Sequence, residues 1–242
     1  MSAPIQQQTT PGNKMILTLG LVATICGVLI VGAFEGTQDA IAENKRITLE
    51  RAVFKVLPGA AKVIEYAATP AGIQPLKGEA IPEGGIKFYA AYDKEGALKG
   101  IAAEAAAKGY ADTVQVLYGY DVQCQCIIGV GVVSMRETPG IGDKILTDVA
   151  FLKNFEALDV RVNSEMTALA NAVKTVKHGT KTNPWQIDAI AGATVTSKAV
   201  GRGINESAQK LMPLLVPRLD AVKGEGLGAA TPAASSNKGE HA

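Results

Sequence analysis

The longest uninterrupted run of apolar residues lies near the N-terminus, at residues 15–34. It contains 20 residues without a charge and is bounded by Lys14 and Glu35. A helix rises about 1.5 Å per residue, so this run would extend about 30 Å, the thickness of the hydrocarbon core of a bilayer. We therefore predict an uncleaved transmembrane anchor at residues 15–34, preceded by a short leader at residues 1–14.

Two other interpretations of this run stay open. A cleaved signal peptide needs small residues before the cut, which residues 31–33 provide, and a buried helix of a soluble protein can have a similar composition. The flanking charges do not fix the direction of the run: Lys14 precedes it, and it is followed by Lys45, Arg46, Arg51 and Lys55. Taken alone, the positive-inside rule leans weakly against an external position for the rest of the chain.

After the anchor, the pattern of apolar and polar residues predicts short strands mixed with helices. Strands are predicted at residues 62–66, 86–92, 114–120 and 126–135, with turn sequences between them. Helices are predicted at residues 37–57, 147–158, 163–173 and 197–215, the last interrupted near Pro213 and ended by Pro217. The Ala-rich residues 100–108 are compatible with a helix or a loop.

These elements predict an α+β fold, in which a single N-terminal transmembrane helix is followed by one mixed, mainly antiparallel sheet domain. We expect the folded domain at residues 36–218. Residues 219–242 are rich in Gly, Ala, Ser and Lys, and they cannot bury enough apolar surface to become ordered. A disordered tail is therefore predicted there.

The charge balance and the cysteines narrow the possible functions. The 242 residues include 24 Lys+Arg and 23 Asp+Glu, a net charge of +1, whereas a nucleic-acid-binding domain normally has a clustered basic excess. Three cysteines are too few for a disulfide scaffold or a four-thiolate metal site. Cys124 and Cys126 are expected on one face of a strand, either as small core residues or as half of an iron–sulfur site completed by another subunit.

Candidate chemistry is concentrated at residues 188–197, with the sequence Asp-Ala-Ile-Ala-Gly-Ala-Thr-Val-Thr-Ser. Gly192 precedes three hydroxyl side chains, those of Thr194, Thr196 and Ser197, and a helix is expected to begin near Thr196 or Ser197. Such hydroxyls commonly cap a helix, and a helix N-terminus also attracts anions, phosphate in particular. Simple capping and phosphate binding are both compatible with this segment.

Residues 188–194 resemble the flavinylation motif Asp-x-x-Ser/Thr-Gly-Ala-Thr of the FMN-binding domain in the G subunit of the Rnf electron-transport complex and the C subunit of Na⁺-translocating NADH:quinone reductase. In that family, a flavin transferase that uses FAD joins FMN to the motif threonine through a phosphoester. The resemblance implies that Thr194 is the acceptor, that Gly192 and Ala193 leave room for the phosphate, and that Asp188 belongs to the recognition pattern. Ala191 departs from the family, which usually has Ser or Thr there.

A second segment, Arg-Glu-Thr-Pro-Gly-Ile-Gly-Asp-Lys at residues 136–144, resembles the Glu-Thr-Pro-Gly-Leu-Gly loop of the same family. Alone, it is also an ordinary Pro-Gly turn after a strand. The resemblance implies that this loop lies against the flavin ring, with contacts from Glu137, Thr138, Pro139, Gly140, Ile141 and Gly142. Three further residues are candidate cofactor contacts: Trp185 as a wall of the site or a core residue, and Thr196 and Lys198 near the phosphate.

The resemblance implies an electron-carrier subunit, in which the flavin supplies the redox chemistry. The chain has two histidines, His178 and His241, and no catalytic constellation of its own. A complex of the Rnf type moves electrons between reduced ferredoxin and NAD⁺ and couples this to ion translocation. The expected partners are its other membrane subunits and iron–sulfur subunits, with the flavin transferase during maturation.

This interpretation places the anchor in the cytoplasmic membrane and the FMN domain on its periplasmic or extracellular side. Three alternatives remain: a C-type subunit of the Na⁺-translocating quinone reductase, a membrane-anchored sensory or structural flavin module, and a soluble secreted flavoprotein. The shorter spacing before the Glu-Thr-Pro-Gly loop favours the Rnf G subunit over the first of these.

Overall fold

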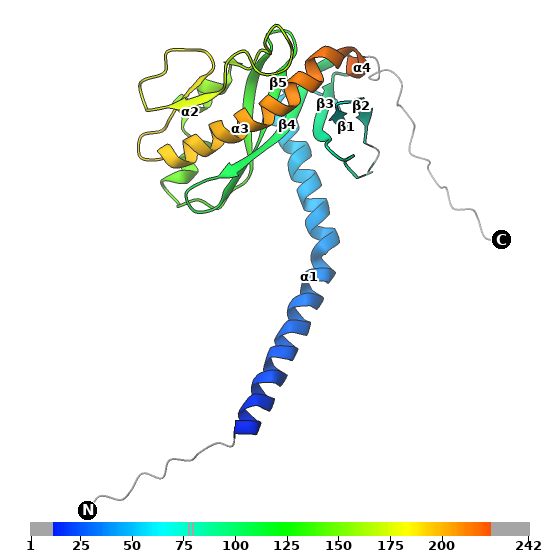
Figure 1. The fold of residues 1–242 in the computed structure, drawn as a ribbon, viewed down its shortest axis with the longest axis vertical. Coiled ribbons are helices and arrows are strands. Elements are labelled where there is room, and N and C mark those ends of the chain that lie inside the picture. The colour runs from blue at the N-terminus through cyan, green and yellow to red at the C-terminus, as the bar shows by residue number, and fades with distance from the viewer. Residues whose placement is uncertain (1–11, 77, 79, 224–242) are drawn as a thin grey trace, which may run out of the picture. The chain divides into compact units, whose positions relative to one another are not determined.

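The computed structural model describes residues 12–76, 78 and 80–223, which divide into two compact units between Ile47 and Thr48. The elements are shown in Figure 1. The helices are α1 (Gly12–Val56), α2 (Val149–Leu152), α3 (Thr194–Leu215) and α4 (Leu219–Lys223), with 3₁₀ turns η1 (Gly142–Leu146), η2 (Lys153–Phe155) and η3 (Val216–Arg218). The strands are β1 (Lys62–Thr69), β2 (Gly72–Pro75), β3 (Ile86–Tyr92), β4 (Leu98–Lys108), β5 (Thr113–Asp121), β6 (Cys126–Ser134), β7 (Leu158–Asp159), β8 (Lys174–Val176) and β9 (Gln186–Asp188).

The first unit is the N-terminal part of α1, which contains the predicted anchor. Its apolar segment is long and apolar enough to cross a membrane and is fully exposed. Separate elements were expected for the anchor and residues 37–57, but α1 is one continuous helix of 45 residues. No proline interrupts it, and the hydroxyl of Thr37 at the expected junction donates to the carbonyl of Ala33 within the helix. Of the predicted leader, residues 12–14 are helical and residues 1–11 lie outside the described residues.

The second unit is built on a seven-stranded sheet in the order β2-β1-β3-β4-β5-β6-β7, in which every pair is antiparallel. Strands β8 and β9 form a separate, small parallel pair. The predicted α+β class is therefore confirmed. Successive residues of a strand face opposite sides of the sheet, so the sheet has two apolar faces with different partners.

Helix α3 covers one face of this sheet, and Figure 1 shows it crossing the strands. The helix approaches closely because small residues meet at the contact. A Cβ at Gly203 would lie 3.2 Å from the backbone carbon of Ala106 in β4. Buried Ala103 and Ala105 on the same strand extend this shallow surface under the helix.

The other face is covered by the last turns of α1, through Leu49, Val53 and Val56. Glycines in β5 and β6 form the surface on which these turns rest. A Cβ at Gly119 would lie 2.5 Å from the carbonyl oxygen of Val56, and one at Gly129 would lie 3.1 Å from it. The absence of side chains at these glycines lets the helix backbone lie directly against the strands.

Several sequence predictions of secondary structure were wrong. Residues 98–108 form strand β4, because pairing with β3 on one side and β5 on the other outweighs the helix propensity of alanine. Residues 163–173 form no helix: the side chain of Asn163 accepts backbone N–H bonds from Thr167 and Ala168 and closes a turn instead. The expected helix at residues 147–158 is limited to α2 and η2.

The C-terminal helix also differs from its prediction. It begins at Thr194 and runs through Pro213 without interruption. Residues 219–223 of the predicted disordered tail form α4, in which Val222 is buried and its carbonyl accepts a 2.8 Å hydrogen bond from the hydroxyl of Tyr92. The rest of the predicted tail, residues 224–242, lies outside the described residues.

Candidate cofactor site

A cavity of about 450 Å³ lies between the loop after β6 and the N-terminus of α3. Both motifs identified in the sequence contribute to it, although they are far apart in the chain. Its lining consists of Tyr110, Glu137, Thr138, Ile141, Gly142, Gly192, Ala193, Thr194, Val195 and Thr196. The fold therefore brings the predicted ring loop and the predicted attachment segment to one site.

The attachment segment is a tight loop between β9 and α3. Gly192 has φ of 84°, a left-handed conformation that a side chain disfavours. The fully buried Ser197 fixes the loop from inside: its Oγ accepts from the N–H of Ile190 at 3.1 Å and donates to the carbonyl of Ala193 at 2.9 Å. Helix α3 consequently begins at Thr194, and Ser197 lies within its first turn, so the prediction that Thr196 or Ser197 caps the helix was wrong.

The three hydroxyls of this segment have different surroundings. Ser197 is bonded within the loop, and Thr196 donates to Oε2 of Glu137 at 2.9 Å. The half-buried hydroxyl of Thr194 lines the cavity and forms no hydrogen bond within the part of the chain that the structure describes. Thr194 is therefore the hydroxyl that is open to a ligand.

Glu137 holds the cavity together from the opposite side. Its Oε1 accepts from the backbone N–H of Ala111 at 3.2 Å, and its Oε2 accepts from Thr196. Two glycines make room for this side chain: a Cβ at Gly142 would lie 2.6 Å from Cβ of Glu137, and one at Gly109 would meet its carboxylate. The carboxylate therefore joins three segments: the β4–β5 turn, the loop after β6 and the first turn of α3.

The loop after β6 is a closed turn. The N–H groups of Ile141 and Gly142 both donate to the carbonyl of Thr138, and Gly140 has φ of 77°. Thr138, Ile141 and Gly142 line the cavity, whereas Pro139 and Gly140 are exposed and do not line it. Half of the Ile141 surface is exposed at the rim of the cavity.

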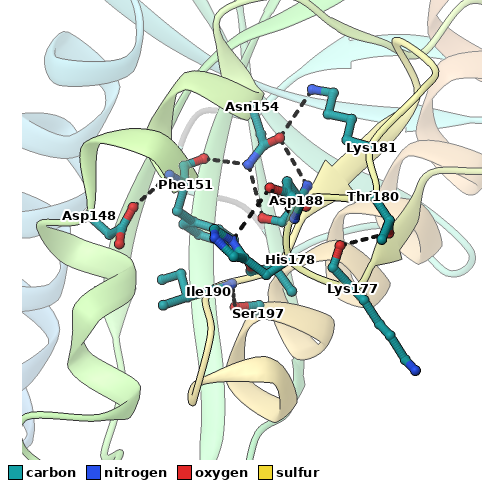
Figure 2. A network of polar contacts seen from close by, with 12 residues as sticks. Asp148, Phe151, Asn154, Lys177, His178, Thr180, Lys181, Asp188, Ile190 and Ser197 are labelled. Atoms are coloured by element: carbon teal, nitrogen blue, oxygen red, sulfur yellow. Dashed lines mark hydrogen bonds and ion pairs between the residues drawn. The ribbon is translucent and has the colours of Figure 1, made fainter.

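Asp188 lies outside the cavity, in the polar network of Figure 2. The buried Asn154 holds its backbone from both sides, because Oδ1 of Asn154 accepts from the N–H of Asp188 at 2.9 Å and Nδ2 donates to its carbonyl at 3.1 Å. The Asp188 carboxylate accepts from the N–H of Gly179 and lies 3.6 Å from His178. This network fixes the start of the attachment segment.

Two other predicted residues lie away from the cavity, and one contributor was not predicted. Trp185 is half-buried just before β9, where its carbonyl accepts from the N–H of Lys174, and Lys198 is exposed on α3. Neither lines the cavity. Tyr110 does line it and is 72% exposed, and an aromatic side chain directly after Gly109 was the sequence signal that could have identified it.

The cysteine pair is neither of the things expected from the sequence. Cys124 and Cys126 form a disulfide in the turn between β5 and β6, with only Cys126 belonging to a strand. Cys124 is exposed, so it is not a core residue. Sulfur atoms bonded to each other cannot act as thiolate ligands, so this state of the pair is not an iron–sulfur half-site.

The sequence of the second unit is similar to a known domain family. Residues 109–209 match the family model described as "FMN-binding domain". The G subunit of the ion-translocating oxidoreductase complex of Pasteurella multocida is 30% identical over 201 residues, which cover 81% of this chain and 91% of that protein. The G subunit of the Na⁺-translocating ferredoxin:NAD⁺ oxidoreductase complex of Acetobacterium woodii is 28% identical over 207 residues, with 81% and 91% covered.

Two solved structures have the same fold. NqrC of Shewanella oneidensis aligns with a TM-score of 0.53 at 19% identity, covering 77% of this chain and 100% of that one. The corresponding NqrC-type protein of the Na⁺-translocating NADH-quinone reductase of Parabacteroides distasonis aligns with a TM-score of 0.57 at 18% identity, covering 74% and 96%. At these identities the likeness concerns the fold.

Proposed function

We propose that this chain, which belongs to the family of G subunits of ion-translocating oxidoreductase complexes, carries FMN on Thr194 through a phosphoester and acts as an electron carrier in such a complex. The observation that carries this proposal is the state of the three hydroxyls. Thr196 and Ser197 are each committed to internal hydrogen bonds, whereas Thr194 is open to the cavity.

The residues at the site suit a flavin phosphate. The first N–H groups of a helix have no partner within the helix, and they carry a partial positive charge that attracts anions. In α3 these are the N–H groups of Thr194, Val195 and Thr196, next to the open hydroxyl. The cavity also has a volume within the range of about 300–1,000 Å³ that is usual for cofactor sites.

The rest of the lining would hold the ring system. Tyr110, Ile141 and Val195 provide apolar surface at the rim, and Thr138 provides a polar group. When bound, FMN supplies electron transfer, and the chain supplies its position and surroundings. A phosphoester would keep the cofactor on the protein although the rim is exposed to a partner.

Attachment requires that an enzyme reaches Thr194, and the loop before it is accessible. Ala191 and Gly192 are exposed, and the network around Asn154 and Ser197 holds the loop in one conformation. We infer that a flavin transferase recognises this loop together with Asp188, whose backbone is fixed by the same network.

The disulfide supports a position of the domain on the periplasmic or extracellular side of the membrane. Disulfides persist in oxidising compartments and are rare in the cytosol. The protein is anchored by α1, which contains the membrane-crossing segment. A domain with the Cys124–Cys126 bond is therefore expected on the oxidising side, in contact with other subunits of the complex.

Co-expression of the full chain with a flavin transferase tests the attachment site. After denaturing electrophoresis, the wild-type band should fluoresce under ultraviolet light, and Thr194→Ala should abolish the fluorescence. Thr113→Ala, which changes an exposed threonine at the start of β5, is the matched control and should fluoresce like the wild type. A fluorescent Thr194→Ala band would overturn the assignment.

A second experiment tests the role as an electron carrier. The chain would be assembled with the other subunits in membranes that also receive reduced ferredoxin and NAD⁺. Reduction of NAD⁺ should be lost with Thr194→Ala and retained with Thr113→Ala. A flavin that stays oxidised while NAD⁺ is being reduced would instead favour a sensory or structural role.

A further inference from the structure

The disulfide lies in the turn between β5 and β6 and has no part in the proposed flavin chemistry. Its two Cα atoms are 5.2 Å apart. Cys124 is exposed in the turn, whereas Cys126, the first residue of β6, is only 7% exposed. A thiolate from solution can therefore reach the sulfur of Cys124 more readily than that of Cys126.

The bond contributes little to holding the fold. It closes over one intervening residue, and the stabilisation from a disulfide grows with the length of the loop that it closes. The turn also has its own hydrogen bonds: the carboxylate of Asp121 accepts from the N–H of Gln123 at 2.6 Å and from that of Cys124 at 3.2 Å. Reduction should therefore leave the turn and the sheet in place.

The residue between the two cysteines adds a reason for the bond to open. Gln125 has φ of 52°, in the left-handed region that is unfavourable for a residue with a side chain. The disulfide is one of the constraints that hold Gln125 there, together with the hydrogen bond from the N–H of Val160 to its carbonyl. Opening the disulfide removes the covalent constraint.

We propose that Cys124–Cys126 is a thiol–disulfide exchange site whose substrate is a dithiol. A thiolate of the dithiol attacks Sγ of Cys124, which forms a mixed disulfide and breaks the bond to Cys126. Cys126 leaves as a thiolate and takes up a proton. The second thiol of the dithiol then attacks its own sulfur in the mixed disulfide and releases Cys124. The chain gains two electrons and two protons, and the dithiol becomes a disulfide.

This site is independent of the cavity. Tyr110 precedes β5 and Glu137 follows β6, whereas the cysteines lie where β5 ends and β6 begins. Each strand has nine residues, so at about 3.4 Å per residue the two sites lie at opposite ends of the hairpin, about 27 Å apart. Exchange at the cysteines is therefore a reaction with an external dithiol.

The test uses the full chain in detergent, with Cys26→Ser so that only the pair reports. Folded protein is treated with dithiothreitol, quenched with acid and labelled with a maleimide polymer that shifts its mobility in a gel. No label is expected before reduction and two labels after it, with a rate in the folded state within about tenfold of that in urea. Two labels before reduction, or reduction only in urea, would overturn the proposal.

Single variants test which sulfur is attacked. Cys126→Ser leaves the exposed Cys124 thiol, which should react with a neutral maleimide at least about tenfold faster than the Cys126 thiol of Cys124→Ser. Equal rates or the reverse order would contradict the direction of attack. Circular dichroism of the reduced protein with both cysteines should match that of the oxidised protein, and loss of structure on reduction would show that the bond is structural instead.

Discussion

Thr196 and Glu137 join the two segments that line the cavity through a single 2.9 Å hydrogen bond from the hydroxyl of Thr196 to Oε2 of Glu137. Thr196 is buried, and the acceptor is a carboxylate. Replacing Thr196 by Val keeps the shape and removes the donor, which should lower the free energy of unfolding by about 1.5–3 kcal/mol. Flavin fluorescence of the gel band should also fall relative to the wild type.

Thr113→Val is the control for this change, because Thr113 is an exposed threonine. It should change neither the unfolding free energy nor the fluorescence. If Thr196→Val retains full fluorescence and full stability, the bond to Glu137 does not hold the two segments together.

Asn154 is expected to position the attachment segment from a distance. It is 4% exposed and bonds both backbone groups of Asp188. Asn154→Asp keeps the size and the acceptor, but it replaces the Nδ2 donor by an oxygen that faces the carbonyls of Phe151 and Asp188. We expect a loss of about 2–4 kcal/mol in unfolding free energy.

Flavin incorporation separates positioning from mere stability in this variant. At a temperature where Asn154→Asp is still folded by circular dichroism, its rate of flavin incorporation should be below that of the wild type. Asn171→Asp, which changes a half-buried asparagine in the loop before β8, is the control. Normal incorporation in folded Asn154→Asp would show that the network does not position the loop.

Two tyrosines of β5 provide a matched test of buried hydroxyls. The hydroxyl of Tyr118 lies 3.0 Å from Oγ of Ser207, whereas that of Tyr120 is buried without a partner among the described residues. Burial raises the pKa of Tyr120 to about 12. Tyr118→Phe should lower the unfolding free energy by about 1 kcal/mol, and Tyr120→Phe should leave it unchanged or raise it. Equal losses in chemical denaturation would contradict this assignment.

The glycines under the end of α1 provide a second matched pair. A Cβ at Gly119 would lie 2.5 Å from the carbonyl oxygen of Val56, whereas one at Gly131 would be in ordinary contact, 3.4 Å from Cγ1 of Val56. Gly119→Ala should cost about 1–3 kcal/mol of unfolding free energy, because the helix end has to shift, and Gly131→Ala should cost less than about 1 kcal/mol. Thermal unfolding of the two variants measures this difference, and a smaller loss for Gly119→Ala would argue against the close contact.

The pair Asp159 and Arg161 predicts a dependence of stability on pH. The side-chain hydrogen bonds from Arg161 hold the pKa of Asp159 below its ordinary value. A lowered pKa in the folded state contributes stability above the unfolded pKa of about 3.9, and this contribution is lost as the pH falls through the folded pKa. Between pH 6 and pH 3, urea denaturation should therefore show a larger loss for the wild type than for Arg161→Gln. Arg136→Gln should behave like the wild type.

The sequence predicted those elements whose signal is local. The uncharged run identified the membrane-crossing helix, and the alternating pattern gave β3 its observed bounds of Ile86–Tyr92. The Ala-rich strand β4 was ambiguous because its conformation depends on pairing with β3 and β5, which is not visible in a local window. The same limit applied to Asn163, whose side chain closes a turn where a helix was predicted.

The candidate site was predictable in its motifs and not in its connections. The attachment segment and the ring loop were both identified from their residues, and both line the cavity. The roles of Thr196 and Ser197 were not, because their partners Glu137 and Ile190 follow from the fold. The contribution of Asn154 was missed for the same reason, since a buried asparagine has no characteristic local sequence.

The close contact between Gly203 and Ala106 has a consequence at the far end of α3. A helix is stiff, and nine residues at about 1.5 Å each place Gly203 about 13 Å along the axis from Thr194. A side chain added at Gly203 would act on the helix as on a lever, and the displacement would reach the acceptor hydroxyl. Tolerance to substitution at this glycine is therefore set by the distance over which a phosphoester has to be formed, although no ligand would touch the glycine itself.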